Sequence, residues 1–238
     1  RELHRHDVPV PAFRGVDDAA DLRDALEELG EPLMLKAREG GYDGRGNAPV
    51  ESVAEAREAF GDLEGLIAEE MVDFERELSV IGAKGADGTA TFPVVENVHE
   101  AEILRTTVAP GRASEAVRER ADAVAREVLD VLWGRGVYGI ELFETRDGEI
   151  LVNEIAPRPH NSGHYTIEGA VTSQFEQHVR GVLGLPLGST ALRDPAVMVN
   201  VLGDVETPQE AELRGVDAVY RARGAHLHWY GKREVRPL

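Results

Sequence analysis

Cysteine is absent from this chain of 238 residues, which excludes a disulfide framework and a thiolate metal site. Lysine is scarce, since only Lys36, Lys84 and Lys232 occur among 26 basic residues. No run of 18 or more apolar residues is present, so we expect no membrane span. The start of the chain also lacks a charged stretch followed by an apolar one, and we expect a cytoplasmic protein without a signal peptide.

The net charge of −18 narrows the range of partners. Such a surface repels phosphates, so we expect no nucleic-acid partner. An acidic surface that uses arginine rather than lysine is typical of proteins from salt-loving organisms, in which salt screens the repulsion between carboxylates. An ordinary acidic protein is the alternative. A hydrophobic content of 42% allows a sizeable core, and the length allows one large domain or two modest ones.

Hydrophobic periodicity and capping residues predict the elements. Helices are expected over residues 17–30, 52–61, 114–136 and 165–183, and strands over 32–36, 65–71, 137–145 and 149–155. Residues 76–98 are typical of a hairpin with one solvated face, and 197–230 alternate like strands. Because hairpins recur among interleaved strands and helices, the pattern favours an α+β architecture over a doubly wound parallel sheet.

A glycine-rich loop, "REGGYDGRGN" (38–47), follows a buried strand that ends at Lys36. Glycines let a backbone approach a ligand closely and turn its N–H groups toward an anion. The loop matches neither the P-loop nor the GxGxxG pattern. A phosphate-binding loop and a plain surface turn are therefore both open.

Two carboxylates, Glu141 and Glu154, lie on neighbouring predicted strands joined by a tight turn at 146–148. Partial burial side by side would raise their pKa values unless a cation lay between them. Mg²⁺ fits such a pair, because it takes a few carboxylates together with nucleotide phosphates. Two solvated carboxylates are the alternative. Strand alternation is expected to point Asn153 away from Glu154.

The segment "APRPHNSGH" (156–164) follows the second of these strands. It gathers Arg158, His160, Asn161, Ser162 and His164 within nine residues. The planar guanidinium of arginine suits the recognition of phosphate or carboxylate. A histidine metal site is the competing interpretation, although further ligands at suitable spacing are lacking.

Several segments in order resemble one family. They are "KAREGGYDGRGN", "LIAEEMVDFERELSVIGAKG", "ILRTTVAP", "NEIAPRPHNSGHYTIEGAVTSQFEQHVRGVLGLPLG" and "HLHWYGK". Together they resemble the ATP-grasp superfamily and, within it, the N5-carboxyaminoimidazole ribonucleotide synthases of purine biosynthesis. The resemblance covers nearly the whole chain. It implies an α+β ATP-grasp fold, in which two subdomains grip ATP, followed by a β-rich segment.

The resemblance also implies domain bounds and residue roles. A linker and helix would span residues 1–31, the lid subdomain 32–100, the metal and substrate subdomain 101–185, and the β-rich segment 186–238. ATP would be bound by Lys36, Gly41, Tyr42, Asp43, Gly44, Arg45, Gly46, Asn47, Glu69, Glu70, Met71, Val72, Glu77, His99, Asn153 and Glu154. Within that set Lys36 would touch the phosphates, 41–47 would form a lid, 69–72 would hold adenine and Glu77 the ribose. Glu141 and Glu154 would bind Mg²⁺ or Mn²⁺. The substrate would be held by Tyr42, Arg45, Arg158, His160, Asn161, Ser162 and Lys232, with Lys36, Arg158 and His160 catalytic.

The implied reaction is the ATP- and bicarbonate-dependent carboxylation of aminoimidazole ribonucleotide, with carboxyphosphate as intermediate. A homodimer is a candidate assembly. The family has a Rossmann-like N-terminal domain and a longer C-terminal segment than this chain, so we expect a truncated sequence. The stretch "GKREVRP" is one residue longer than the family pattern, and Lys232 and Arg233 compete for one role.

Three other interpretations remain. Formate-dependent glycinamide ribonucleotide transformylase is a related ATP-grasp enzyme with a "PRPH" loop, but its loop continues with other residues than Asn161 and Ser162. Biotin carboxylase lacks support, because its loop signatures are missing. A nucleotide-binding fragment without catalytic activity belongs to a different class, and turnover would separate it from the enzymes.

Overall fold

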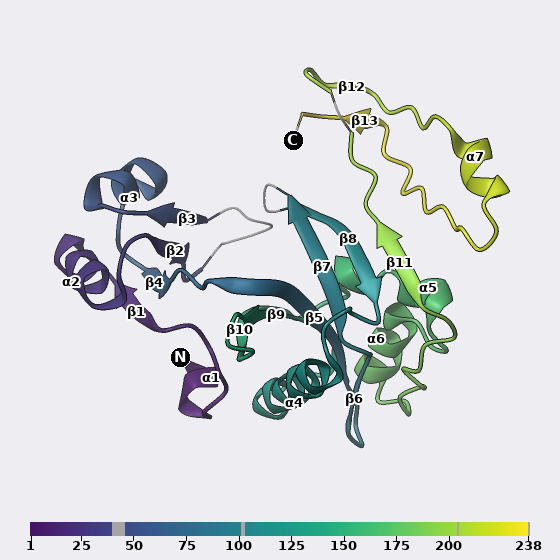
Figure 1. The fold of residues 1–238 in the computed structure, drawn as a ribbon, viewed down its shortest axis with the longest axis horizontal. Coiled ribbons are helices and arrows are strands. Elements are labelled where there is room, and N and C mark those ends of the chain that lie inside the picture. Colours follow the sequence, from purple (N-terminus) through teal and green to yellow (C-terminus); the bar gives the residue numbers. More distant parts are fainter. Residues whose placement is uncertain (40–45, 101–102, 204, 238) are drawn as a thin grey trace. The chain divides into compact units, whose positions relative to one another are not determined.

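The computed structural model describes residues 1–39, 46–100, 103–203 and 205–237 (Figure 1). The loop positions 40–45, which include the predicted ligands Gly41, Tyr42, Asp43, Gly44 and Arg45, lie outside the described residues. By its internal contacts the chain divides into two compact units, Arg1–Val199 and Asn200–Leu238. The four domain bounds expected from the sequence, 1–31, 32–100, 101–185 and 186–238, stay a prediction.

A small antiparallel sheet forms one part of the first unit. Its order is β1 (Phe13–Val16), β4 (Leu66–Glu70), β2 (Leu33–Ala37) and β3 (Asn47–Val50). Helices α2 (Ala19–Leu29) and α3 (Val53–Phe60) share a buried apolar core with these strands. Asp18 and Ser52 cap the two helices by accepting hydrogen bonds from backbone N–H groups. The helices predicted over 17–30 and 52–61 are thus confirmed.

A larger antiparallel sheet forms the rest of that unit. Its order is β10 (Ile150–Ala156), β9 (Gly136–Thr145), β5 (Phe74–Lys84), β7 (Val95–Glu100), β8 (Ile103–Ala109) and β11 (Ala196–Val199), and β6 (Thr89–Thr91) pairs with β5. Figure 1 shows the long strand β5 running through the middle of this sheet, with α4 (Glu115–Val131) packed beside it. Within the described residues all strand pairings are antiparallel, which confirms the α+β class.

The two faces of the large sheet have different coverings. Leu78, Val80, Ile140 and Leu142 point to the α4 face and join its core. Ile81 of β5 belongs to a separate buried cluster on the opposite face. That face is covered at one end by α6 (Gln174–Leu183), which contacts β5 and β9. The alternation along β5 and β9 therefore leaves Glu77, Ser79 and Glu141 on the face opposite α4.

Four sequence expectations are corrected. Strand β5 was expected to have one wet face, yet positions 78–83 are all buried because helices cover both faces. The third helix was expected to reach 136, but it ends at Val131, where Leu132 turns to extended backbone. The helix expected over 165–183 is interrupted between α5 (Thr166–Gly169) and α6. There the backbone N–H groups of Val171 and Thr172 bond to Ala191 and Ser189 instead.

The fourth correction concerns residues 197–230. They were expected to alternate as strands, but residues 216–221 form helix α7 (Val216–Arg221). Val216, Val219 and Tyr220 repeat at helical spacing inside the apparent alternation. The second unit also contains the short pair β12 (Gln209–Glu210) and β13 (Glu234–Val235). Among the described residues, no helix is long and apolar enough to cross a bilayer.

Candidate functional site

Glu141 and Glu154 face one another across β9 and β10, where they are partners in the strand register. The side chain of Glu141 is 19% exposed, whereas Glu154 is exposed. Burial is the main reason that the pKa of Glu141 rises to about 7, and the Glu154 and Glu77 carboxylates raise it further, while His99 and Lys36 lower it. The predicted carboxylate pair is therefore brought together, and one of its members resists ionisation.

A β-bulge at Asn153 shapes this pair. The register shifts between Val152 and Glu154, so that Asn153 is an extra residue in β10. Asn153 consequently lines the same pocket as Glu141, and its amide oxygen lies 3.4 Å from the Lys36 ammonium nitrogen, which donates to it. The two-residue alternation that was expected to point Asn153 away from Glu154 is interrupted by this bulge, and Asn153 lines the pocket together with Glu141.

Lys36 connects the small sheet to this site. Its ammonium group lies 2.7 Å from the Glu69 carboxylate, which comes from the neighbouring strand β4, and close to Asn153 of the large sheet. The ammonium group is thus held at the meeting point of the two sheets, with 23% of the side chain exposed. A fixed cation beside a carboxylate pair is suited to binding the phosphates of a nucleotide.

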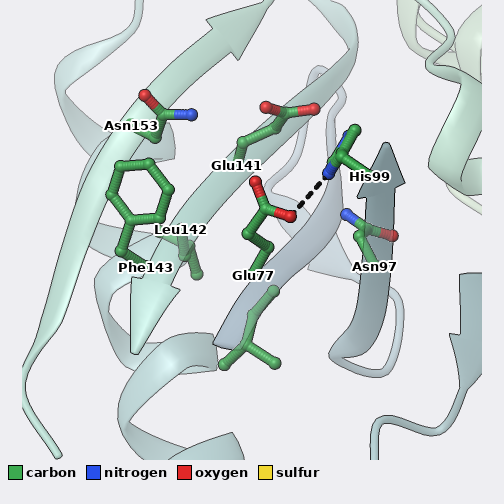
Figure 2. A pocket seen from close by; sticks show the side chains of 8 residues that line it. Glu77, Asn97, His99, Glu141, Leu142, Phe143 and Asn153 are labelled. Atoms are coloured by element: carbon green, nitrogen blue, oxygen red, sulfur yellow. Dashed lines mark hydrogen bonds and ion pairs between the residues drawn. The ribbon is translucent and has the colours of Figure 1, made fainter. Parts of the chain in front are cut away.

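A shallow pocket opens between β5, β7 and β9 (Figure 2). Figure 2 shows Glu77, His99, Glu141 and Asn153 gathered around it. His99 Nδ1 donates to the Glu77 carboxylate at 2.8 Å. Burial alone would lower the pKa of His99, but the bond to Glu77 and the charge of Glu141 together raise it. The neighbouring carboxylates thus favour the protonated form of the His99 imidazole.

The segment after β10, residues 157–164, brings a histidine close to the Glu141 carboxylate. Nε2 of His160 lies 3.4 Å from a Glu141 carboxylate oxygen. Arg158 is exposed at the start of the segment, and Asn161 begins the short helix η1 (Asn161–Gly163). The predicted substrate loop and the predicted metal pair are thus neighbours in space.

Ser162 differs from the expectation. Its side chain is fully buried, and its hydroxyl bonds to Ser79 and to His160 Nδ1 at 2.8 and 2.9 Å. A hydroxyl so enclosed cannot meet a substrate directly. The prediction of a direct substrate contact by Ser162 is corrected, because its hydroxyl is bonded to the His160 imidazole and to Ser79 inside the protein.

The remaining predicted residues are dispersed. Gly46 takes a positive φ of 99°, and Asn47 begins β3 beside Lys36. The Glu70 carboxylate accepts a hydrogen bond from the Ala12 backbone at 2.9 Å, while Met71 and Val72 lie in the segment that joins the two sheets. Lys232 is exposed in the second unit.

Several residues at the site were not predicted from the sequence. Gln174, Ser79, Asn97 and Thr107 are buried polar side chains near His160, and Phe143 lines the pocket, stacked on Phe74 at 4.7 Å between ring centroids. The polar residues interrupt otherwise apolar strand and helix patterns, and that interruption was the available signal.

The donor set suits Mg²⁺. Glu141 and Glu154 offer hard oxygen ligands, and burial together with the neighbouring carboxylates raises the pKa of Glu141 and so disfavours its charged form in the absence of a bound cation. The described part of the chain has no cluster of three or more histidine, cysteine, aspartate or glutamate side chains arranged for one ion. Two carboxylates match the preference of Mg²⁺ for few protein ligands with the remaining positions left to phosphate and water.

The comparisons with known families define the class of protein. The family model of the ATP-grasp domain matches residues 1–175, and the model of the phosphoribosylaminoimidazole carboxylase C-terminal domain matches 196–238. The chain belongs to the ATP-grasp family.

Within that class, the chain is similar to N5-carboxyaminoimidazole ribonucleotide synthases. It is 43% identical to the Bacillus subtilis enzyme over 95% of the chain and 44% identical to the Synechococcus elongatus enzyme over 99%. It spans 59% and 60% of those two proteins.

Solved structures of enzymes with the same name are also similar to this chain. The synthetase of Thermotoga maritima superposes with a TM-score of 0.86 at 43% identity, over 99% of this chain and 61% of that one. The Aspergillus clavatus synthase, solved with ADP and 5-aminoimidazole ribonucleotide, superposes with a TM-score of 0.88 at 35% identity, over 99% and 63%.

Proposed function

We propose that this protein carboxylates 5-aminoimidazole ribonucleotide at the expense of ATP, giving N5-carboxyaminoimidazole ribonucleotide in purine biosynthesis. It would be a ligase that forms a carbon–nitrogen bond, with ATP, bicarbonate and the ribonucleotide as substrates. The observation that carries the proposal is the meeting of two sequence motifs: His160 of the substrate loop lies 3.4 Å from Glu141 of the carboxylate pair. The similarity to synthases of this reaction supports it.

Bicarbonate would attack the γ-phosphate of ATP, break its bond to the bridging oxygen and release ADP, giving carboxyphosphate. The exocyclic amine of the ribonucleotide would then bond to the carboxyl carbon, with loss of a proton from the amine and release of phosphate. Mg²⁺ held by Glu141 and Glu154 would neutralise charge on the phosphates. Lys36, fixed between Glu69 and Asn153, would add a positive charge there without any reorganisation.

Nucleotide binding would use residues of both sheets. Residues 41–47 would cover the phosphates, 69–72 would hold adenine through their backbone, and Glu77 would hold the ribose. The carboxylate and the backbone N–H of Glu70 are both bonded to Ala12, so the backbone N–H groups offered to adenine would come from the other residues of 69–72. His99 would keep Glu77 oriented through its 2.8 Å bond.

Substrate binding would centre on the segment after β10. Arg158 and His160 would face the reacting carboxyl or phosphate group, with Asn161 beside them. Tyr42, Arg45 and Lys232 would complete the ribonucleotide site. A cytoplasmic location, a homodimer and a halophilic origin belong to the same proposal.

A coupled ATPase assay separates the proposed function from its closest rival. ADP release by the complete protein should depend on aminoimidazole ribonucleotide with bicarbonate. Release that depends instead on glycinamide ribonucleotide with formate would assign the transformylase reaction. Nucleotide binding without turnover on either pair would assign a binding protein.

A further inference from the structure

A line of buried polar side chains crosses the large sheet behind the site. It consists of Thr107 on β8, Asn97 on β7, Ser79 on β5 and Ser162 in η1. Asn97 is 5% exposed and the other three are fully buried. Buried polar groups stabilise a fold little compared with apolar side chains of the same shape, so a connected set points to a requirement for orientation.

Each member bonds to the next. The Thr107 hydroxyl donates to the Asn97 amide oxygen at 3.0 Å, and the Asn97 amide nitrogen donates to Ser79 at 3.0 Å. The Ser79 hydroxyl donates to Ser162 at 2.8 Å. Ser162 Oγ lies 2.9 Å from His160 Nδ1, so the line ends on the imidazole.

Thr107 determines which group donates and which accepts in each hydrogen bond of this line. Among the described residues its hydroxyl has one hydrogen-bond partner, the Asn97 amide oxygen. If the Asn97 amide were flipped, its nitrogen would face Thr107 and the buried hydroxyl proton would lose its acceptor, at a cost of about 1–3 kcal/mol. Ser162 accepts from Ser79, and among the described residues the other partner of its hydroxyl is His160 Nδ1. If Nδ1 carried a hydrogen and donated to Ser162, the buried Ser162 O–H would be left without an acceptor, so the favoured arrangement has Ser162 donating to Nδ1. The imidazole hydrogen consequently resides on Nε2, which faces Glu141 at 3.4 Å.

The backbone of His160 is fixed by a second device. The fully buried Gln174 amide accepts from the His160 backbone N–H at 2.9 Å and donates to the His160 carbonyl oxygen at 2.7 Å. The backbone N–H of Gln174 in turn donates to Thr166 at 2.9 Å. A side chain at Gly139 would place its Cβ 2.5 Å from His160 Cβ, so glycine there is what lets the histidine lie against β9.

We propose that Thr107, Asn97, Ser79 and Ser162 are positioning residues, which with Gln174 hold His160 in the Nε2–H tautomer and aim that hydrogen at the carboxylate pair and its substrate. The inference rests on the proposed function for its consequence in turnover. Its structural content, the tautomer, is independent of the reaction.

The tautomer is measured by long-range nitrogen–proton NMR correlation on protein labelled at histidine, at about pH 8.5, well above the usual histidine pKa of about 6.5. A His160→Gln spectrum assigns the signal by its disappearance. The expected result is a hydrogen on Nε2 and an unprotonated Nδ1. A hydrogen on Nδ1, alone or together with one on Nε2, overturns the inference.

The Thr107→Val variant removes the hydroxyl while nearly preserving shape. Without the Thr107 hydroxyl, either orientation of the Asn97 amide leaves one of its buried polar atoms without a partner. The two orientations then cost about the same, so we expect a mixture of the two His160 tautomers. The KM for aminoimidazole ribonucleotide should rise on the order of tenfold, below the ~100-fold that a displacement of 1 Å can cost, while the KM for ATP stays within about twofold. Thr107→Ser keeps the donor and should restore both the single tautomer and the KM.

Ser114→Ala is the matched control, because it removes the N-cap of α4 at a cost of about 1 kcal/mol without touching the line. It should alter neither tautomer nor KM. A single tautomer in Thr107→Val, or an equal KM change in Ser114→Ala, contradicts the inference. If the wild-type protein shows the Nε2–H tautomer but does not use the ribonucleotide, the proposed function fails and the positioning of His160 stands.

Discussion

At the residue scale, Glu141 has a carboxyl group that is largely buried among other charges. Its pKa in the folded protein is raised to about 7 from a usual value of 4.5, chiefly by burial. The folded state therefore binds more protons than the unfolded state between these values. The stabilising effect of protonated Glu141 is complete below about pH 4.5 and is lost as the pH rises through 7.

We expect the metal-free protein to lose unfolding free energy between about pH 5 and pH 7.5, measured by urea denaturation. Glu141→Gln should flatten that slope, because a neutral amide does not titrate. Mg²⁺ should restore stability mainly above pH 7, since metal binds the deprotonated carboxylate. An unchanged slope in Glu141→Gln would show that Glu141 is not responsible.

Glu154 tests the metal pair from its exposed side. Glu154→Gln removes one charge from a solvated position, so stability should change by no more than about 0.5 kcal/mol. ATP-dependent turnover should fall at least tenfold, or ~1.4 kcal/mol in transition-state binding, because one of the two proposed metal carboxylates is lost. Thermal unfolding and steady-state kinetics on the same sample decide. Turnover that survives intact would remove Glu154 from the metal site.

Arg158 tests the substrate loop. Arg158→Lys keeps the charge but loses the planar, two-pronged donor, so carboxylation should fall on the order of tenfold, ~1.4 kcal/mol. ATP affinity, measured by calorimetry, should stay nearly constant because Lys36 and the carboxylates remain. Loss of ATP affinity with unchanged carboxylation would put Arg158 in the wrong part of the site.

Glu141, Glu154 and His160 were singled out from the sequence because carboxylates and histidine amid apolar strands or a compact loop are uncommon. The structure brings these three residues together, and their roles stay predictions. Asn153 was misplaced because one inserted residue reverses every alternation argument beyond it. Ser162 was misassigned because a loop sequence does not reveal that neighbouring strands will bury it.

At the element scale, the carboxyl end of helix α4 is bonded to the side chain of one of the three lysines, Lys84 of β5. The Lys84 ammonium group, at the end of β5, donates to the carbonyl oxygen of Leu129 at 2.6 Å and to that of Leu132. These carbonyl groups belong to the last turn, which carries partial negative charge. A compact ammonium suits two converging carbonyl groups better than a planar guanidinium does.

We expect Lys84→Met to lower the unfolding free energy by about 1.5–3 kcal/mol, since it removes charged hydrogen bonds from the end of α4. Urea denaturation measures the loss, and Ser114→Ala at the other end of the same helix gives the scale of an ordinary cap. If Lys84→Met is as stable as the wild type, the lysine does not hold the helix end.

Helices and strands were predictable where local signals agreed. Ser114 caps α4 as expected, and the apolar stripe from Val117 to Val128 is buried. The helix expected over 165–183 breaks because Val171 and Thr172 satisfy their N–H groups with residues about twenty positions away. Strand β5 lost its expected wet face for the same kind of reason, since the second covering helix lies far along the chain.

At the scale of the whole molecule, the chain has 44 acidic side chains and only 26 basic ones. If the surface is adapted to salt, the melting temperature should rise steeply from low to molar KCl, because the added ions screen repulsion between carboxylates. Calorimetry in KCl without divalent ions measures this. A melting temperature that stays level over that range would indicate an ordinary acidic protein.

The family was accessible from sequence because several distinctive segments occur in order, from the glycine-rich loop to "HLHWYGK". Their joint geometry was not. The pairing of β9 with both β5 and β10 sets Glu141 opposite Glu154 and brings it into one pocket with Glu77, and these neighbours come from segments far apart in the chain.

The central claim is tested most directly by following labelled bicarbonate. The complete protein is incubated with ATP, Mg²⁺, aminoimidazole ribonucleotide and carbon-labelled bicarbonate, and the product is trapped and identified by mass spectrometry. The account predicts label on the exocyclic amine as a carboxylate, with one ADP formed for each labelled product. Formylated glycinamide ribonucleotide from formate in a parallel reaction, with no label entering aminoimidazole ribonucleotide, would contradict it.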